Sequence, residues 1–269
     1  MDQHPECYTI GSGIPVVLLH SSMSSKEQWG KLMDVLQEKY QVIAIDLYGY
    51  GVSPLPPNGF EFTLLQEAER IQTIIKQFIG DVKFHLLGHS YGAATALRFA
   101  YDHQEQLLSL SLYEPVAFHL LAKDDPALLV IVKLAEQIKQ AVDCGDLSTG
   151  TRIFVDFWSG GGTYANIHME RQRSLNRYIQ KVLLDFQAGI YEPLTIDDYA
   201  RLQLPTCLIA GRKSPPSTRK IVENIARTLP QLEMHWIDGG HMAPITHAAT
   251  VNRIWVDFLA NISTTAICP

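Results

Sequence analysis

The sequence predicts an α/β fold, in which a mostly parallel central sheet carries helices on both faces and an inserted helical segment. Two observations lead to this prediction. Short, continuous apolar runs alternate with amphipathic stretches of helical period, a pattern typical of strands that helices cover on both sides. Between residues 117 and 200 the apolar runs stop, and helical patterns follow one another directly. We therefore expect one core, formed by residues 1–116 and 201–269, with residues 117–200 inserted as a helical cap.

The expected strands are short apolar runs rich in branched side chains, as is typical of buried strands. Amphipathic stretches lie between them; in one of these, Thr63 is suited to begin a helix and Gly80 to end it. Strands are expected at residues 14–20, 41–47, 82–88, 107–114, 204–211 and 232–238. Helices of the core are expected at residues 24–40, 63–80, 91–103, 217–230 and 248–262, and helices of the inserted segment at 124–145, 151–162 and 176–190.

The composition is that of a globular protein that is neither basic nor membrane-spanning. The 269 residues are 46% hydrophobic and 19% charged, and the formal net charge is -6. Lysine and arginine form no run, which argues against nucleic acid or an anionic membrane as the main partner. No stretch of about 18 consecutive apolar residues indicates a transmembrane helix, and the first residues lack the pattern of a signal peptide. We expect a cytoplasmic protein that acts on a small molecule; the sequence does not indicate an oligomeric state.

Metal and cofactor binding is not expected. The cysteines are scattered and form no C-x-x-C pair, and the sequence contains no H-E-x-x-H motif. A chain of this length does not need disulfides in order to fold, so free thiols are expected. The cysteines are Cys7, Cys144, Cys207 and Cys268.

Residues 88–92, Gly-His-Ser-Tyr-Gly, carry the strongest functional signal. An expected strand ends at Gly88 and an expected helix begins at Tyr91, so Ser90 lies at the junction. A sharp strand-to-helix turn requires small residues beside it and presents the serine hydroxyl, as in a nucleophile elbow. The free N–H groups at the helix start also point to the place where an oxyanion would form. Ser90 is therefore the expected nucleophile.

Four motifs, in the same order along the chain, resemble those of the α/β-hydrolase superfamily, and the resemblance extends over nearly the whole length. They are VVLLHSS (16–22), DLYGYGVS (46–53), GHSYG (88–92) and DGGHMAPITH (238–247). The resemblance implies a cofactor-independent hydrolase with a serine nucleophile and a histidine base. It says little about the substrate, because members of one fold act on very different molecules.

His241 is the expected base, since it follows a strand and two glycines that free its loop to aim the ring at Ser90. The family position implies that the backbone N–H groups of Ser22 and Tyr91 form the oxyanion hole. Ser21 replaces the glycine that the family usually has, so the backbone there is expected to differ.

The acid that completes a triad is less obvious. An imidazole base needs an acid that holds its tautomer and stabilises the imidazolium. The family most often places an aspartate after the strand that follows the cap, but Ser214 occupies that place here. Some members carry the acid after the strand that precedes the cap, where this sequence has Glu114. We therefore expect Glu114 to be the acid; weaker candidates are Asp238, Asp197 and Asp198.

Apolar and aromatic side chains of the inserted segment are expected to roof the serine, among them Phe118, Phe154 and Trp158. Such a pocket favours a small or medium carboxylic ester, thioester or lactone, cleaved through an acyl-enzyme. Carbon–carbon bond hydrolysis of a ring-cleavage product and ligand binding without catalysis are the alternatives. Epoxide hydrolysis and dehalogenation are not favoured, because the resemblance implies an aspartate at the position of Ser90 in members with those activities.

Overall fold

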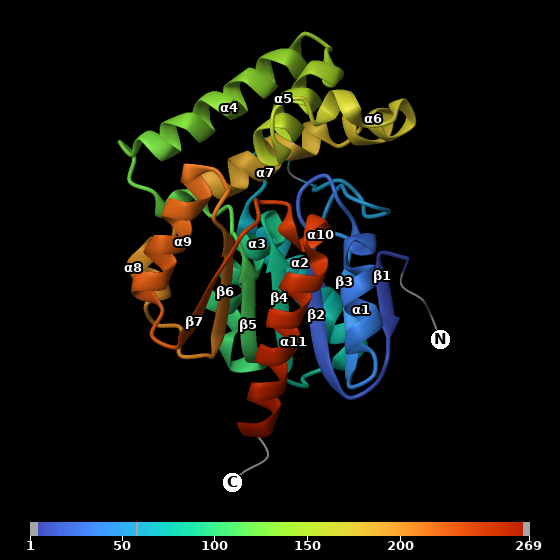
Figure 1. Cartoon of the computed structure of the whole chain (residues 1–269), viewed down its shortest axis with the longest axis vertical. Helices are drawn as coiled ribbons and strands as arrows, with labels where there is room; N and C mark the ends of the chain where they lie inside the picture. The colour runs from blue at the N-terminus through green and yellow to red at the C-terminus, as the bar shows by residue number, and fades with distance from the viewer. Residues whose placement is uncertain (1–4, 58, 266–269) are drawn as a thin grey trace.

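A seven-stranded sheet forms the centre of the protein in the computed structural model, which describes residues 5–57 and 59–265 (Figure 1). The strand order is β1-β3-β2-β4-β5-β6-β7, and every neighbouring pair except β1 and β3 is parallel. The prediction of a mostly parallel sheet is therefore confirmed. The strands are β1 (Cys7–Ile10), β2 (Ile14–Leu19), β3 (Tyr40–Ile45), β4 (Phe84–His89), β5 (Leu107–Tyr113), β6 (Thr206–Gly211) and β7 (Leu232–Ile237).

The edge strand β1 is not among the strands expected from the sequence. It pairs antiparallel with β3, with Cys7 opposite Ile45, and only Cys7 of its four residues is buried. A short edge strand that buries so little apolar surface produces no apolar run. The sequence therefore carries no strong signal for it.

The strand order creates a switch point between β2 and β4. The chain passes from β2 to β3 on one side and then returns to form β4 on the other side of β2. In sheets of this kind, ligands bind at the carboxyl ends of the strands beside such a point. Here β2 leads into the loop that contains Ser21 and Ser22, and β4 leads into Ser90.

Helices cover both faces of the sheet, and strand residues alternate between two hydrophobic cores. Val16 and Leu18 of β2 pack with residues of α1 and α11, whereas Val17 and Leu19 pack with residues of α2, α3 and α9. This period of two is the one that a strand buried on both faces requires. The helices are α1 (Gly30–Leu36) and α11 (Ala248–Thr265) on one face, and α2 (Leu64–Ile79), α3 (Tyr91–His103) and α9 (Pro216–Thr228) on the other.

The inserted segment (residues 117–200) lies between β5 and β6 in the chain, and its helices α4 to α7 lie above one end of the sheet (Figure 1). Three of its helices, α4, α5 and α7, correspond to the helical patterns of the sequence. The other two were not expected: α6 buries only Leu175, and α8 has four residues, so neither shows an amphipathic period. The bounds are α4 (Pro126–Asp143), α5 (Leu147–Ser159), α6 (Met169–Asn176), α7 (Ile179–Ile190) and α8 (Ile196–Tyr199).

Short helical turns complete the described fold, and α10 lies just beyond the loop that carries His241. These turns are η1 (Lys26–Trp29), η2 (Gly59–Glu61), η3 (Gln104–Gln106), η4 (Phe118–Leu120), η5 (Tyr164–Asn166) and α10 (Ala243–Thr246).

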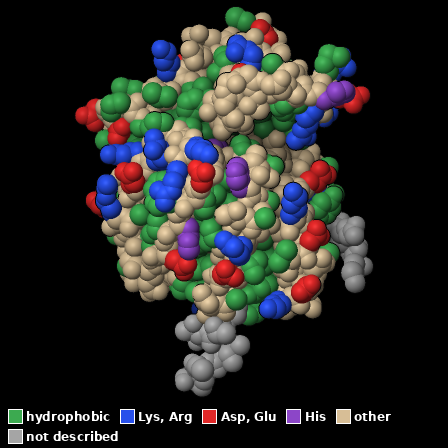
Figure 2. Space-filling model, viewed as in Figure 1, with side chains coloured by type: hydrophobic (Ala, Val, Ile, Leu, Met, Phe, Trp, Pro, Cys, Tyr) green, Lys and Arg blue, Asp and Glu red, His purple; other side chains and the backbone are tan. Residues whose placement is uncertain are grey.

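The described residues show neither a membrane span nor a disulfide. None of their helices combines the length and the apolar character needed to cross a membrane. Cys7, Cys144 and Cys207 are free, and Cys268 lies outside the described residues. On the face shown in Figure 2, acidic and basic side chains lie among one another.

Candidate active site

Ser90 occupies a tight turn between β4 and α3. Its φ is +57°, in the left-handed region that a residue with a side chain rarely adopts and that is often found at functional sites. The turn depends on its two flanking glycines. A Cβ on Gly88 would lie 2.4 Å from the carbonyl oxygen of Gly92, and a Cβ on Gly92 would lie 2.3 Å from that of Leu19. The sequence G-x-S-x-G thus permits a close approach of α3 to the sheet that larger residues would prevent.

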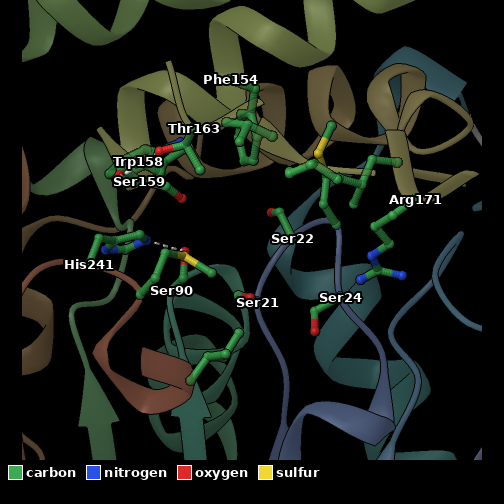
Figure 3. A pocket seen from close by; sticks show the side chains of 16 residues that line it. Ser21, Ser22, Ser24, Ser90, Phe154, Trp158, Ser159, Thr163, Arg171 and His241 are labelled. Carbon is green, nitrogen blue, oxygen red and sulfur yellow. Dashed lines mark hydrogen bonds between the residues drawn. The ribbon is translucent and has the colours of Figure 1, made fainter. Parts of the chain in front are cut away.

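The structure brings Ser90, His241 and Glu114 into one hydrogen-bonded row. His241 Nε2 lies 2.8 Å from Ser90 Oγ, and His241 Nδ1 lies 2.7 Å from Glu114 Oε2 (Figure 3 shows the serine–histidine bond). All three side chains are almost fully buried. Because a carboxylate accepts from Nδ1–H, Nε2 is left to accept the proton of the serine hydroxyl. Such a row can remove that proton as the serine oxygen attacks.

Glu114 is held from a second direction. Its other carboxylate oxygen, Oε1, accepts a hydrogen bond of 2.7 Å from the backbone N–H of Gly211 at the end of β6. Glu114 itself has a φ of +42°, so its backbone is also in the left-handed region. The position at which an aspartate was expected by resemblance holds Ser214, whose buried hydroxyl has no hydrogen-bond partner within the described part of the chain.

The weaker acid candidates lie elsewhere. The exposed side chain of Asp238 forms an ion pair with Lys213, with a distance of 3.0 Å between Nζ and Oδ1. Asp198 accepts hydrogen bonds from the backbone and side chain of Thr195 at the start of α8. Asp197 is in the first turn of the same helix. Of the proposed acids, only Glu114 is hydrogen-bonded to His241 in the described structure.

The two residues expected to form the oxyanion hole lie on either side of the switch point. Ser22 is in the loop after β2, and Tyr91 is the first residue of α3. The first N–H groups of a helix have no partner within the helix, so that of Tyr91 is available to a ligand. Ser22 lines a cavity together with Ser90 and His241.

A chain of side chains that sequence reasoning missed joins the oxyanion loop to the histidine loop. Gln28 Oε1 accepts from the N–H and hydroxyl of Ser21, and Gln28 Nε2 lies 3.1 Å from His89 Nδ1. His89 Nε2 lies 2.9 Å from the carbonyl oxygen of His241. Burial lowers the pKa of His89 well below its usual value, so the ring is neutral, donating from Nε2 and accepting at Nδ1. Gln28 has no motif around it that could have revealed this role.

The cavity above Ser90 has an outer and an inner part. The outer part, of about 210 Å³, is lined by Ser90, His241 and side chains of the inserted segment (Figure 3). Phe154 and Trp158 line both parts, whereas Phe118 lines only the small inner part. The three expected pocket residues are therefore at the cavity. The Trp158 ring also lies over that of His241, with 4.3 Å between their centroids.

Two charged residues at the cavity escaped sequence reasoning. Asp185 of α7 lines the inner part, and Arg171 of α6 lines the outer part. Arg171 is one of several polar residues in α6, and the pattern of α7 predicts a helix without marking Asp185, so the sequence gives no reason to single them out. Among the described residues, no cluster of three or more His, Cys, Asp or Glu side chains is arranged to hold a metal ion.

Comparison with known proteins agrees with this architecture. The family described as "alpha/beta hydrolase fold" matches residues 14–248. A soluble epoxide hydrolase from Corynebacterium sp. (strain C12) is 26% identical over 237 residues, which cover 86% of this chain and 75% of that protein. A poly(3-hydroxyalkanoate) depolymerase from Ectopseudomonas oleovorans is 24% identical over 252 residues, covering 91% of this chain and 84% of the depolymerase.

Solved structures show the same fold. The enol-lactonase from Burkholderia xenovorans LB400 superposes with a TM-score of 0.77 and 16% identity, over 94% of this chain and 95% of the lactonase. The family match begins at the first residue of β2 and ends at the first residue of α11, so it includes the loops of Ser22, Ser90, Glu114 and His241. The chain therefore belongs to the α/β-hydrolase family.

Proposed function

We propose that the protein is a serine hydrolase that cleaves a small or medium carboxylic ester, thioester or lactone through an acyl-enzyme. One observation carries the proposal: Ser90, His241 and Glu114 form a continuous hydrogen-bonded row at the floor of a largely apolar cavity. This geometry is what a serine hydroxyl needs to become a nucleophile.

The first half-reaction transfers the acyl group to the enzyme. Ser90 Oγ attacks the carbonyl carbon while His241 Nε2 takes the hydroxyl proton. The carbonyl oxygen becomes an oxyanion, which accepts hydrogen bonds from the N–H groups of Ser22 and Tyr91; donors of this kind contribute about 3–4 kcal/mol each to the transition state. When the tetrahedral intermediate collapses, the bond to the leaving oxygen or sulfur breaks, and His241 gives its proton to that atom.

The second half-reaction restores the serine. A water molecule attacks the acyl carbon while His241 Nε2 takes one of its protons. The ester bond to Ser90 then breaks, the proton passes from His241 to Ser90 Oγ, and the carboxylic acid leaves. Glu114 keeps its negative charge throughout, orients the ring and stabilises the imidazolium in both halves.

The residue at the nucleophile position separates this proposal from epoxide and haloalkane chemistry. One relative is named an epoxide hydrolase, and the resemblance to the family implies an aspartate nucleophile for that activity. In such chemistry the carboxylate attacks a carbon and water then hydrolyses the resulting ester. Ser90 cannot form that ester, because its oxygen is a hydroxyl and not part of a carboxylate.

A panel of chromogenic substrates tests the proposal. p-Nitrophenyl acetate and butyrate, a thioester and a lactone should be hydrolysed by the wild type, and Ser90→Ala and His241→Ala should abolish turnover. A vinylogous diketone tests carbon–carbon bond hydrolysis in parallel. If the enzyme cleaved only the diketone, carbon–carbon bond hydrolysis would replace acyl-ester hydrolysis as the function. Tight binding of these compounds without turnover would indicate a ligand-binding protein.

A further inference from the structure

Each of the two residues proposed to form the oxyanion hole also donates a side-chain hydrogen bond to a buried carboxylate. The hydroxyl of Ser22 donates to Asp185 Oδ2 of α7 over 2.5 Å. The phenol of Tyr91 donates to Glu67 Oε2 of α2 over 3.2 Å. Neither carboxylate takes part in the proton transfers described above, so the contacts call for a different explanation.

One lysine joins the two carboxylates. Lys181 forms an ion pair with Asp185, one helical turn along α7, and its Nζ lies 3.8 Å from Glu67 Oε2. The Nζ also lies over the ring of Tyr91, 4.6 Å from the centroid. Only 1% of the Lys181 side chain is exposed. We call Lys181, Asp185 and Glu67 the Lys181 cluster.

Further contacts fix the cluster to the core. Tyr50 donates to Asp185 Oδ2 over 2.5 Å, and the backbone N–H of Tyr48 donates to Glu67 Oε1 over 3.0 Å. These groups belong to the loop after β3, whereas Lys181 and Asp185 belong to the inserted segment. The cluster therefore connects the helix above the cavity with both sides of the oxyanion hole.

Stability alone does not account for the cluster. Burial raises the pKa of both Asp185 and Glu67, which shows that the ionised carboxylates are costly to keep in the interior. Buried ion pairs are often no more stabilising than apolar side chains of the same size. These buried charges contact the two residues proposed to form the oxyanion hole. Holding those two residues in place explains the charges better than a gain in stability does.

The loop beside Ser22 is a place where such positioning is needed. Met23, the next residue, has a φ of +58° although it carries a side chain. A backbone in this region persists only when surrounding contacts hold it. The bond from Ser22 to Asp185 is such a contact, and it also uses the hydroxyl proton of Ser22. The backbone N–H of Ser22 is then the donor left for the substrate.

We propose that the Lys181 cluster positions the oxyanion hole from the inserted segment, aiming the N–H groups of Ser22 and Tyr91 before the substrate arrives. This inference rests on the proposed function. Lys181, Asp185 and Glu67 are positioning residues: they act on the transition state through Ser22 and Tyr91. Their loss should therefore lower kcat and leave KM nearly unchanged, because the donors bind the oxyanion more strongly than the ground-state carbonyl.

Asp185→Asn and Ser22→Ala are the main test variants. Asp185→Asn leaves Lys181 with only its longer contact to Glu67, and Ser22→Ala removes the hydroxyl anchor while it keeps the backbone N–H. Each should reduce kcat for p-nitrophenyl acetate, and the rate of labelling by a fluorophosphonate, by about 10- to 100-fold, the usual effect of a misplaced catalytic group. The double variant should lose little more than either single one, because both changes act on the same contact: Asp185→Asn weakens it by removing the charge, and Ser22→Ala removes it.

Glu192→Gln is the matched control. Glu192 is a buried acid that pairs with Arg98 over 3.1 Å, in the segment between α7 and α8, and it does not line the cavity. Glu192→Gln should lower the melting temperature, as Asp185→Asn does, but it should leave kcat and the labelling rate at the wild-type level. Ser22→Ala is a small change in a half-buried loop, so it keeps the test open if Asp185→Asn does not fold.

The outcomes separate the inference from the function on which it rests. A wild type that no fluorophosphonate labels would remove the serine-hydrolase function and the inference together. A labelled wild type, with Asp185→Asn and Ser22→Ala reacting equally fast, would overturn the inference alone. Equal loss of kcat in Glu192→Gln, or fully additive losses in the double variant, would also overturn it.

Discussion

His241 Nδ1 lies 2.7 Å from Oε2 of Glu114, a residue 127 positions earlier in the chain. Glu114 follows β5, although resemblance to the family pointed first to the end of β6. The sheet explains why either place can serve. β5 and β6 are parallel neighbours, with Tyr113 opposite Ile209, so their carboxyl ends lie side by side. The bond from Gly211 N–H to Glu114 shows the carboxylate resting against the end of β6.

Glu114→Gln tests the acid directly. The amide removes the negative charge that stabilises the imidazolium and can favour the wrong tautomer of His241, so kcat for p-nitrophenyl acetate should fall by up to ~10⁴-fold. Asp238→Asn is the control, since Asp238 is exposed and pairs with Lys213. Glu114 would not be the acid if a folded Glu114→Gln variant kept the wild-type rate.

Gln28→Leu tests the chain that links the oxyanion loop to the histidine loop. The change leaves the N–H of Ser21 and the Nδ1 of His89 without their side-chain partner. A lost hydrogen bond of this kind costs about 1 kcal/mol, so a drop in kcat of about 5- to 10-fold is expected. Gln37→Leu, which loses only a surface bond to the backbone of Asp34, should have no effect. Equal kinetics of the two variants would leave Gln28 without a catalytic influence.

Phe154→Ala tests the shape of the cavity. Phe154 lines both the outer and the inner part, so truncation should join them and admit larger acyl groups. The ratio of kcat/KM for p-nitrophenyl hexanoate over acetate should rise about tenfold if the enlarged cavity buries about two more methylenes of the hexanoyl chain, since each contributes about 0.8 kcal/mol. Phe157→Ala is the matched control, because Phe157 packs on Trp158 without lining either part. A similar rise in both variants would argue against Phe154 as the side chain that separates the outer part of the cavity from the inner part.

The buried ring of His85 should make the free energy of unfolding depend on pH. Burial lowers the pKa of His85 from 6.5 to about 4. Between these values the unfolded chain binds a proton that the folded chain does not, so the free energy of unfolding falls as the pH is lowered from 6.5 to 4. For His85 the loss between pH 7.5 and 5 should be about 2 kcal/mol.

Urea unfolding at pH 7.5 and 5 measures this loss. His85→Gln should unfold with a smaller difference between the two pH values than the wild type. An unchanged difference in His85→Gln would show that His85 does not cause the acid sensitivity.

The sequence predicted the parts of the fold and site that depend on local signals. The parallel strands appeared as apolar runs, because helices bury both of their faces. The triad residues could be proposed because of their places next to strands. Ser90 and Glu114 come directly after a strand, and His241 lies in the loop that follows one. The G-x-S-x-G pattern is local as well, since its glycines prevent clashes within the turn.

Contacts between distant segments could not be predicted in this way. Ser22 and Asp185 are 163 positions apart, and their bond depends on where α7 packs over the core. Asp185 and Lys181 appear in the sequence as ordinary polar residues of an amphipathic helix. Gln28 is likewise an unremarkable residue of a short helical turn. Tertiary packing, which has no local pattern, gives these residues their partners.

Intact-mass spectrometry after treatment with a small fluorophosphonate tests the central claim, that Ser90 is an activated nucleophile. The wild type should gain one adduct, and peptide mapping should place it on Ser90, whereas Ser90→Ala should gain none and Glu114→Gln should react far more slowly. An unmodified wild type, or an adduct that persists in Ser90→Ala, would contradict the account.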